Sequence, residues 1–174
     1  MIMDSKFRLV VLLNIILLQM LSGFGQLSQT AYAQVGTTLF LPQKGTPVGI
    51  QNFVQLDKGC NWSGIGGQVL SMSGIPLTGL VIKLTGKLEG QDILYYSVTG
   101  GSLQFGPGGF LIELTDHPVA SNKTATLQVL EITGAQKSPP IMLTTYGDCS
   151  HNLLLVNIIE LSMRNAIYFP VIRK

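Results

Sequence analysis

Charge and reactive side chains are scarce in this chain of 174 residues. Only 11% of its residues are charged, and the formal net charge is +2. Its basic residues are spread out, whereas nucleic-acid binding requires a clustered basic face, so we predict no nucleic-acid partner. Valine, isoleucine, leucine, threonine and glycine are nevertheless abundant, which is typical of a folded β-rich protein and not of a disordered one.

Familiar catalytic motifs are also missing. The sequence has no G-x-S-x-G nucleophile elbow, no H-E-x-x-H motif and no phosphate-binding P-loop. A catalytic set of Ser150, His117 and Asp116 can be drawn, but nothing in its spacing supports it. We therefore predict that the chain is not an enzyme and carries no cofactor. A hydrolase with an unrecognised site is the less favoured alternative.

Metal binding is weakly indicated. A zinc site could use Cys60, Cys149, His117 and His151, but structural zinc normally takes close ligand pairs. Here only Cys149 and His151 are close in sequence. Calcium would require three aspartates from separate turns to come together: Asp57, Asp116 and Asp148. Single aspartates in turns more often hydrogen-bond the local backbone, so we predict no metal.

The first residues are typical of an export signal. A short basic start precedes an apolar run over residues 9–21, and Ala31-Tyr32-Ala33 is a small-x-small cleavage site. We predict a signal helix within a signal peptide over residues 1–33, removed to leave Gln34 first. An uncleaved anchor is the alternative, although a spanning helix needs about 20 apolar residues. We expect an extracellular or cell-surface protein without a stable membrane span after cleavage.

The two cysteines are expected to form a disulfide. Both lie among polar turn residues, and an even count in an oxidising compartment fits a single bridge. A bond between Cys60 and Cys149 would close a loop of about 90 residues and stabilise the fold by at most ~4.6 kcal/mol in the chain-entropy model. Two buried free thiols are the alternative.

Short alternating apolar segments, separated by glycine and proline, fill the rest of the chain. Apolar residues alternate in segments 80–84, 110–114, 125–129, 141–145 and 154–158, and residues 93–98 are β-branched and aromatic. Strands that recur roughly every 10–15 residues indicate a sandwich or barrel. We predict an all-β, Ig-like or transthyretin-like antiparallel β-sandwich of about seven to eight strands.

We place this domain at residues 60–163, after a lead-in over residues 34–59. Within the lead-in, residues 38–41 and 52–56 are expected to form short strands. Between them, up to Ile50, we expect no regular structure, because glycine and proline recur there. Residues 164–174 are predicted to be a C-terminal tail or an edge strand.

One stretch is typical of a strand, a tight turn and a second strand: Gly67-Gln68-Val69, Gly74-Ile75-Pro76-Leu77 and Gly79-Leu80-Val81-Ile82. It resembles the opening hairpin of the carboxypeptidase regulatory-like (transthyretin-like) β-sandwich, as in uncharacterised exported bacterial proteins. Later segments keep that family's order: Ser97-Val98-Thr99, residues 106–109 and residues 110–114. The resemblance implies a sandwich fold and no known activity.

Together these features predict an exported, non-enzymatic module with a structural or surface-interaction role. Its partner would be an unknown protein or polysaccharide. A carbohydrate-binding module is the alternative, with a candidate ligand face made of Trp62, Tyr95, Tyr96 and Tyr146. The competing interpretation is that Trp62 packs over the disulfide and the tyrosines cap the core.

Overall fold

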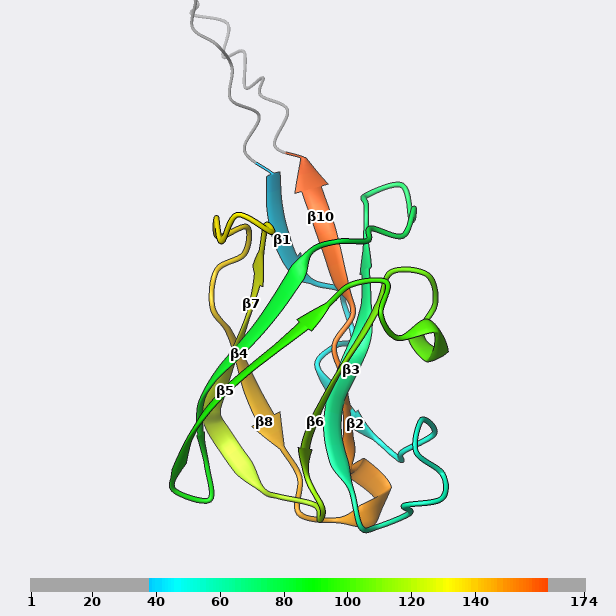
Figure 1. Cartoon of the computed structure of the whole chain (residues 1–174), viewed down its shortest axis with the longest axis vertical. Helices are drawn as coiled ribbons and strands as arrows, with labels where there is room; N and C mark the ends of the chain where they lie inside the picture. Colours follow the sequence, from blue (N-terminus) through cyan, green and yellow to red (C-terminus); the bar gives the residue numbers. More distant parts are fainter. Residues whose placement is uncertain (1–37, 163–174) are drawn as a thin grey trace, which may run out of the picture. The chain divides into compact units, whose positions relative to one another are not determined.

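The computed structural model describes residues 38–162, which form two β-sheets packed face to face (Figure 1). Apart from two single-turn 3-10 helices, the regular structure of these residues is strand, so the all-β prediction is confirmed. Within them, no helix is long and apolar enough to cross a membrane. The predicted signal peptide and the tail at residues 164–174 lie outside the described residues.

The elements follow one another closely along the chain. The strands are β1 (Thr38–Pro42), β2 (Val48–Ile50), β3 (Ser63–Leu70), β4 (Val81–Leu88), β5 (Gln91–Val98), β6 (Gly109–Thr115), β7 (Ser121–Leu130), β8 (Ile141–Thr145), β9 (Leu153–Leu155) and β10 (Ile158–Ser162). The 3-10 helices are η1 (Leu103–Phe105) and η2 (Cys149–His151). They precede β6 and β9 respectively.

The four-stranded sheet has the order β5-β4-β7-β8 and is antiparallel throughout. Alternation of apolar residues predicted its inward face correctly. Ile82, Leu84, Leu127 and Leu143 are all fully buried, because successive side chains in a strand point to opposite faces.

The second sheet is mixed, which corrects the prediction of an antiparallel sandwich. Its order is β1-β10-β3-β9-β2, with β6 on the other side of β3. Both β9 and β10 run parallel to β3, at Gly64↔Leu153 and Val69↔Ile158. On the side away from β3, β9 pairs antiparallel with β2, and β10 pairs antiparallel with β1. The described residues form ten strands, against the predicted seven to eight, because two positions in this sheet are each occupied by two short strands in place of one: β9 with β10, and β2 with β1.

Asn157 sits at the interruption between β9 and β10, inside a segment that we predicted as one continuous strand. Its carbonyl accepts the N–H of Gln43 (2.8 Å) and the hydroxyl of Thr46 (3.0 Å). Its side-chain oxygen accepts the N–H of Gln68 (3.2 Å). These contacts satisfy the carbonyl of Asn157 and the N–H of Gln68, two backbone groups at the interruption.

Strands β3 and β4, which we expected to form a hairpin, belong to different sheets. The turn between them does close locally, because Ser71 N–H donates to Ile75 (2.8 Å) and Leu77 N–H donates to Val69 (2.9 Å). The chain then crosses from the mixed sheet to the four-stranded sheet over residues 77–80. The turn was predicted correctly, whereas the pairing of the two strands was not.

The predicted lead-in supplies two strands of the mixed sheet. Residues 38–41 form a strand as expected and lie within β1, which pairs with β10. Residues 52–56 do not form the expected strand. The side-chain oxygen of Asn52 instead accepts the N–H groups of Val54 and Gln55 (both 2.9 Å), which stabilises a turn.

Two hydrophobic clusters fill the interior. The larger one joins both sheets and includes Ile65 and Phe110 from the mixed sheet and Ile82 and Leu127 from the four-stranded sheet. The smaller one consists of Trp62, Phe105 and Leu153, with partly buried residues packed around it. Because the larger cluster draws on both sheets, the sandwich encloses one main core.

Candidate functional site

Cys60 and Cys149 form a disulfide, which confirms the predicted pairing. The bond joins the loop over residues 51–62 to η2, immediately before β9. It closes a sequence separation of 89 residues. A disulfide is compatible with an extracellular protein.

Asn152 secures the same loop from inside. The side chain is buried, its oxygen accepts the N–H of Asn52 (2.8 Å), and its amide donates to the carbonyls of Gly59 and Trp62 (both 3.0 Å). One amide therefore satisfies three backbone groups of the loop. Hydrophobic alternation could not identify Asn152 as important, because the residue lies between η2 and β9 and is not part of a strand.

The predicted ligand face is not assembled as one platform. Trp62 is 1% exposed and belongs to the smaller hydrophobic cluster. Its indole N–H has no hydrogen-bond partner among the described residues. Tyr95 packs against the main core, whereas Tyr96 points outward from the same strand and is 59% exposed. Tyr146 lies after β8, with its ring 5.2 Å from that of His151.

His117 links two turns of the molecule. Its Nδ1 lies 2.8 Å from the carboxylate of Asp116, and its Nε2 lies 3.1 Å from Glu89 in the turn between β4 and β5. The hydrogen bond to Asp116, followed by that to Glu89, raises the pKa of His117 above 6.5. The same hydrogen bond lowers the pKa of Asp116. These side chains are exposed, so they form a surface ion cluster.

Ser150 contacts Asp148 and His151, not the Asp116 and His117 of the catalytic set that we considered from the sequence and rejected. Its hydroxyl donates to Asp148 (2.6 Å), and Nδ1 of His151 lies 2.7 Å from the same carboxylate oxygen. In a catalytic triad the histidine joins serine and aspartate through opposite ring nitrogens, which this arrangement does not do. Asp148 instead caps η2, and the hydrogen bonds from Ser150 and His151 lower its pKa.

Within residues 38–162, no three His, Cys, Asp or Glu side chains gather in a way that could hold a metal ion. Two of the four residues considered as zinc ligands, Cys60 and Cys149, are bonded to each other.

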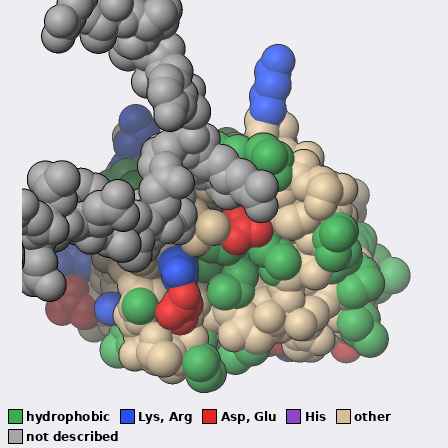
Figure 2. Space-filling view, turned by 90° about the horizontal axis from the view of Figure 1, so that it is seen from above, with side chains coloured by type: hydrophobic (Ala, Val, Ile, Leu, Met, Phe, Trp, Pro, Cys, Tyr) green, Lys and Arg blue, Asp and Glu red, His purple; other side chains and the backbone are tan. Residues whose placement is uncertain are grey.

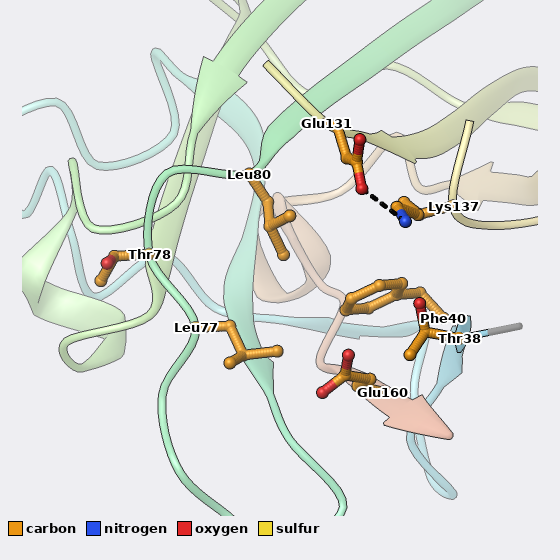
Figure 3. A pocket seen from close by; sticks show the side chains of 8 residues that line it. All are labelled: Thr38, Phe40, Leu77, Thr78, Leu80, Glu131, Lys137 and Glu160. Atoms are coloured by element: carbon orange, nitrogen blue, oxygen red, sulfur yellow. Dashed lines mark ion pairs between the residues drawn. The ribbon is translucent and has the colours of Figure 1, made fainter. Parts of the chain in front are cut away.

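A cavity of about 310 Å³ opens at the end of the sandwich where β1 begins. Figure 3 shows Leu77 and Leu80 pointing from the loop before β4 towards Phe40 of β1. The Glu131–Lys137 ion pair lies beside Phe40, and it lowers the pKa of Glu131. Figure 2 looks onto this end and shows acidic and basic side chains next to hydrophobic ones. Sequence reasoning missed the cavity, because its lining comes from four separate segments.

Strand β5 presents an apolar row on the outer face of the four-stranded sheet. Leu94, Tyr96 and Val98 are 58%, 59% and 46% exposed. The register places Val81 beside Val98, and Leu130 beside Val81 on its other side. Of the row itself, only Tyr96 was predicted as a site residue. The sequence does not distinguish the two faces of this strand, because Ile93 and Tyr95 on the partly buried face are as apolar as Leu94 and Tyr96 on the exposed one.

No family model matches this chain, and no curated protein matches it. Among solved structures, it is similar to the crystal structure of chlorocatechol 1,2-dioxygenase from Pseudomonas putida. The identity is 14% and the TM-score is 0.35, over 91% of this chain and 89% of that chain. Because this neighbour is an enzyme, our prediction that the chain is not one is contradicted and is withdrawn. A TM-score this low carries no argument for dioxygenase activity.

Proposed function

We propose that the chain is an exported β-sandwich module with a surface-interaction role, and that it presents the outer face of the β5-β4-β7-β8 sheet to a partner. One observation carries the proposal. Leu94, Tyr96 and Val98 occupy consecutive outward positions of one strand and are all exposed. Apolar rows of this kind on a soluble domain mark interaction surfaces.

Neighbouring strands extend this surface. Val98, Val81 and Leu130 follow one another across β5, β4 and β7, and Tyr96 lies beside Lys83. Tyrosine is enriched in protein interfaces, whereas lysine is depleted in them. We therefore take the apolar row as the centre of the surface and Lys83 as part of its polar rim.

Export and family membership are part of the same proposal. The signal-like start of the sequence and the Cys60–Cys149 bond support export. The glycine and proline motifs at residues 67–82 and the two-sheet architecture support a transthyretin-like, carboxypeptidase regulatory-like module.

A carbohydrate-binding module is the second candidate. Tyr96 supports it, because an exposed aromatic ring can stack against a sugar ring. Neither Trp62 nor Tyr95 contributes to this face, since the first is buried and the second packs against the core.

Site-specific photo-crosslinking in cells that produce the full chain tests the proposal. A benzophenone side chain would replace Tyr96 in one variant and Leu56 in the control. Leu56 is 75% exposed but lies in the loop over residues 51–62, which is not part of the β5-β4-β7-β8 sheet. We expect covalent adducts from position 96 and none from position 56. Equal labelling at the two positions, or no adduct at position 96, would overturn the proposed surface.

A further inference from the structure

Four sheet edges are present in the described residues, and three of them carry features that hinder pairing with another chain. The edge formed by β1 and β2 is interrupted and contains Pro42, with Pro47 in the interruption. Strand β8 has five residues and directly follows Pro139-Pro140. Strand β6 carries Glu113, which forms an ion pair with Lys58. Proline, charge and short length are the usual means of protecting an edge.

Strand β5 forms the fourth edge and has fewer of these protections, since its one charged residue, Asp92, lies near its start. It runs for eight residues and contains no proline, glycine, lysine or arginine. Its register with β4 is unbroken from Val81↔Val98 to Leu88↔Gln91. A long, regular and apolar edge is a ready template for another strand.

The backbone of β5 is also oriented for pairing. Thr99 N–H donates to the carbonyl of Leu80 (2.9 Å), so the backbone groups of Thr99 face β4. In an antiparallel ladder, alternate residues direct their N–H and C=O groups to the same neighbour. The backbone groups of Tyr96 and Leu94 therefore point away from β4, to the open edge, as does the N–H of Val98. The carbonyl of Val98 already accepts the N–H of Gly101 (3.2 Å), so Leu94 and Tyr96 are the residues that combine exposed apolar side chains with unpaired backbone groups at this edge.

We propose that β5 pairs antiparallel with β5 of a second copy of this chain, about a two-fold axis at Tyr96. The inference rests on the proposed surface-interaction role and names its partner. The pairing would join two four-stranded sheets into one continuous sheet. A two-fold interface of this kind uses the same patch on both copies.

The side chains of β5 are self-complementary in this register. Tyr96 lies opposite Tyr96 of the second copy, and Leu94 lies opposite Val98, so apolar residues meet apolar residues. Asp92 is the single charged residue of the strand. It falls outside the shared ladder and is already paired with Lys87 at 3.1 Å. No like charges are brought together along the shared strands.

The molecular mass of the full chain in solution tests the pairing. We expect sedimentation velocity at micromolar concentration to give a dimer. Tyr96→Lys would weaken dimerisation at least about tenfold, because it places two ammonium groups opposite each other at the axis. The matched control, Leu56→Lys, would leave the dimer unchanged. Circular dichroism verifies that both variants are folded. A monomeric wild type, or a Tyr96→Lys variant that dimerises as strongly as the control, would overturn the inference.

Cysteine cross-linking tests the register. Residues opposite each other in a hydrogen-bonded antiparallel pair have Cα atoms about 5.5 Å apart, which is within disulfide range. Under mild oxidation, Tyr96→Cys should give a covalent dimer on a non-reducing gel, and Leu56→Cys should not. The same outcome for both variants would overturn the register.

The two proposals can fail separately. A monomeric chain whose position-96 adducts contain a different molecule would overturn the self-pairing and leave the proposed interaction surface intact. A chain with no position-96 adducts and no dimer would overturn both.

Discussion

The two sheets of this sandwich are stabilised in different ways. The four-stranded sheet, called the regular sheet below, is antiparallel throughout with one register shift between β7 and β8, and burial at alternate positions accounts for its inward face. The mixed sheet contains parallel pairs and two interrupted lines, and it depends on polar contacts at non-periodic positions such as Asn152 and Asn157. Side chains satisfy buried backbone groups in the first sheet too, where the hydroxyl of Ser138 accepts the N–H of Val129 (2.8 Å). In the second sheet they do so at an interruption of the strands and in the loop over residues 51–62.

Removing the disulfide, which joins the loop over residues 51–62 to η2 before β9 of the mixed sheet, should have the largest effect. Cys60→Ser is expected to lower the free energy of unfolding by up to ~4.6 kcal/mol, because the unfolded chain regains the entropy of a long loop. Urea denaturation with and without reductant measures this. Cys149→Ser should match it, and the double variant should be no worse than either single one. Equal stability of the wild type in oxidising and reducing buffer would contradict the prediction.

Asn152→Ala should come next. It removes hydrogen bonds from three backbone groups of the loop over residues 51–62, and one unsatisfied buried group costs about 1–3 kcal/mol. We expect a loss of about 3 kcal/mol in chemical denaturation. Thr126→Ala is the counterpart in the regular sheet, where the hydroxyl reaches only Met142 Sδ at 3.4 Å, and it should change stability by less than about 0.5 kcal/mol. Similar losses in the two variants would remove the contrast between the sheets.

Gly67→Ala examines close packing in the mixed sheet. A Cβ at this position would lie 2.1 Å from the carbonyl oxygen of Val156, at the interruption before Asn157. Because the clash is with backbone, we expect a loss of about 1–3 kcal/mol in the free energy of unfolding. Gly147→Ala is the control, since its added Cβ would come no closer than 3.4 Å to Ala120. If both variants unfold at the wild-type denaturant concentration, the close approach at Gly67 has no energetic consequence.

The sequence predicted the regular sheet better than the mixed one for a physical reason. Alternation at 80–84, 125–129 and 141–145 reports which side chains face inward, and it does not report which strand lies alongside. The placement of β3 and β4 in different sheets therefore could not be derived from their pattern. The interruption at Asn157 could not be derived either, because it depends on contacts with Gln43 and Gln68, which are distant in sequence.

The candidate sites show the same limit. The Cys60–Cys149 bond was predictable, because only two cysteines exist to pair. The cavity beside Phe40 draws its lining from four segments that only the fold brings together. The aromatic residues were identified by type, but which of them face outward depends on details of packing. Tyr95 and Tyr96 are neighbours with opposite orientations.

The smallest effect on stability is expected from a surface ion pair that joins the two sheets. His117 follows a strand of the mixed sheet, and Glu89 lies in the β4–β5 turn of the regular one. The pKa of His117 is raised in the folded chain, so its contribution to stability is fully present below its unfolded pKa, near 6.5, and is lost as pH rises through the folded value.

The stability advantage of the wild type over His117→Gln should therefore shrink in denaturation experiments as the pH rises from below 6.5 through the raised folded pKa of His117. A proton NMR titration should place the pKa of His117 above 6.5 in the wild type and nearer 6.5 in Glu89→Gln. The shift should not vanish in that variant, because the hydrogen bond to Asp116 is its larger cause. A wild-type value at or below 6.5 would show that this bridge between the sheets is absent in solution.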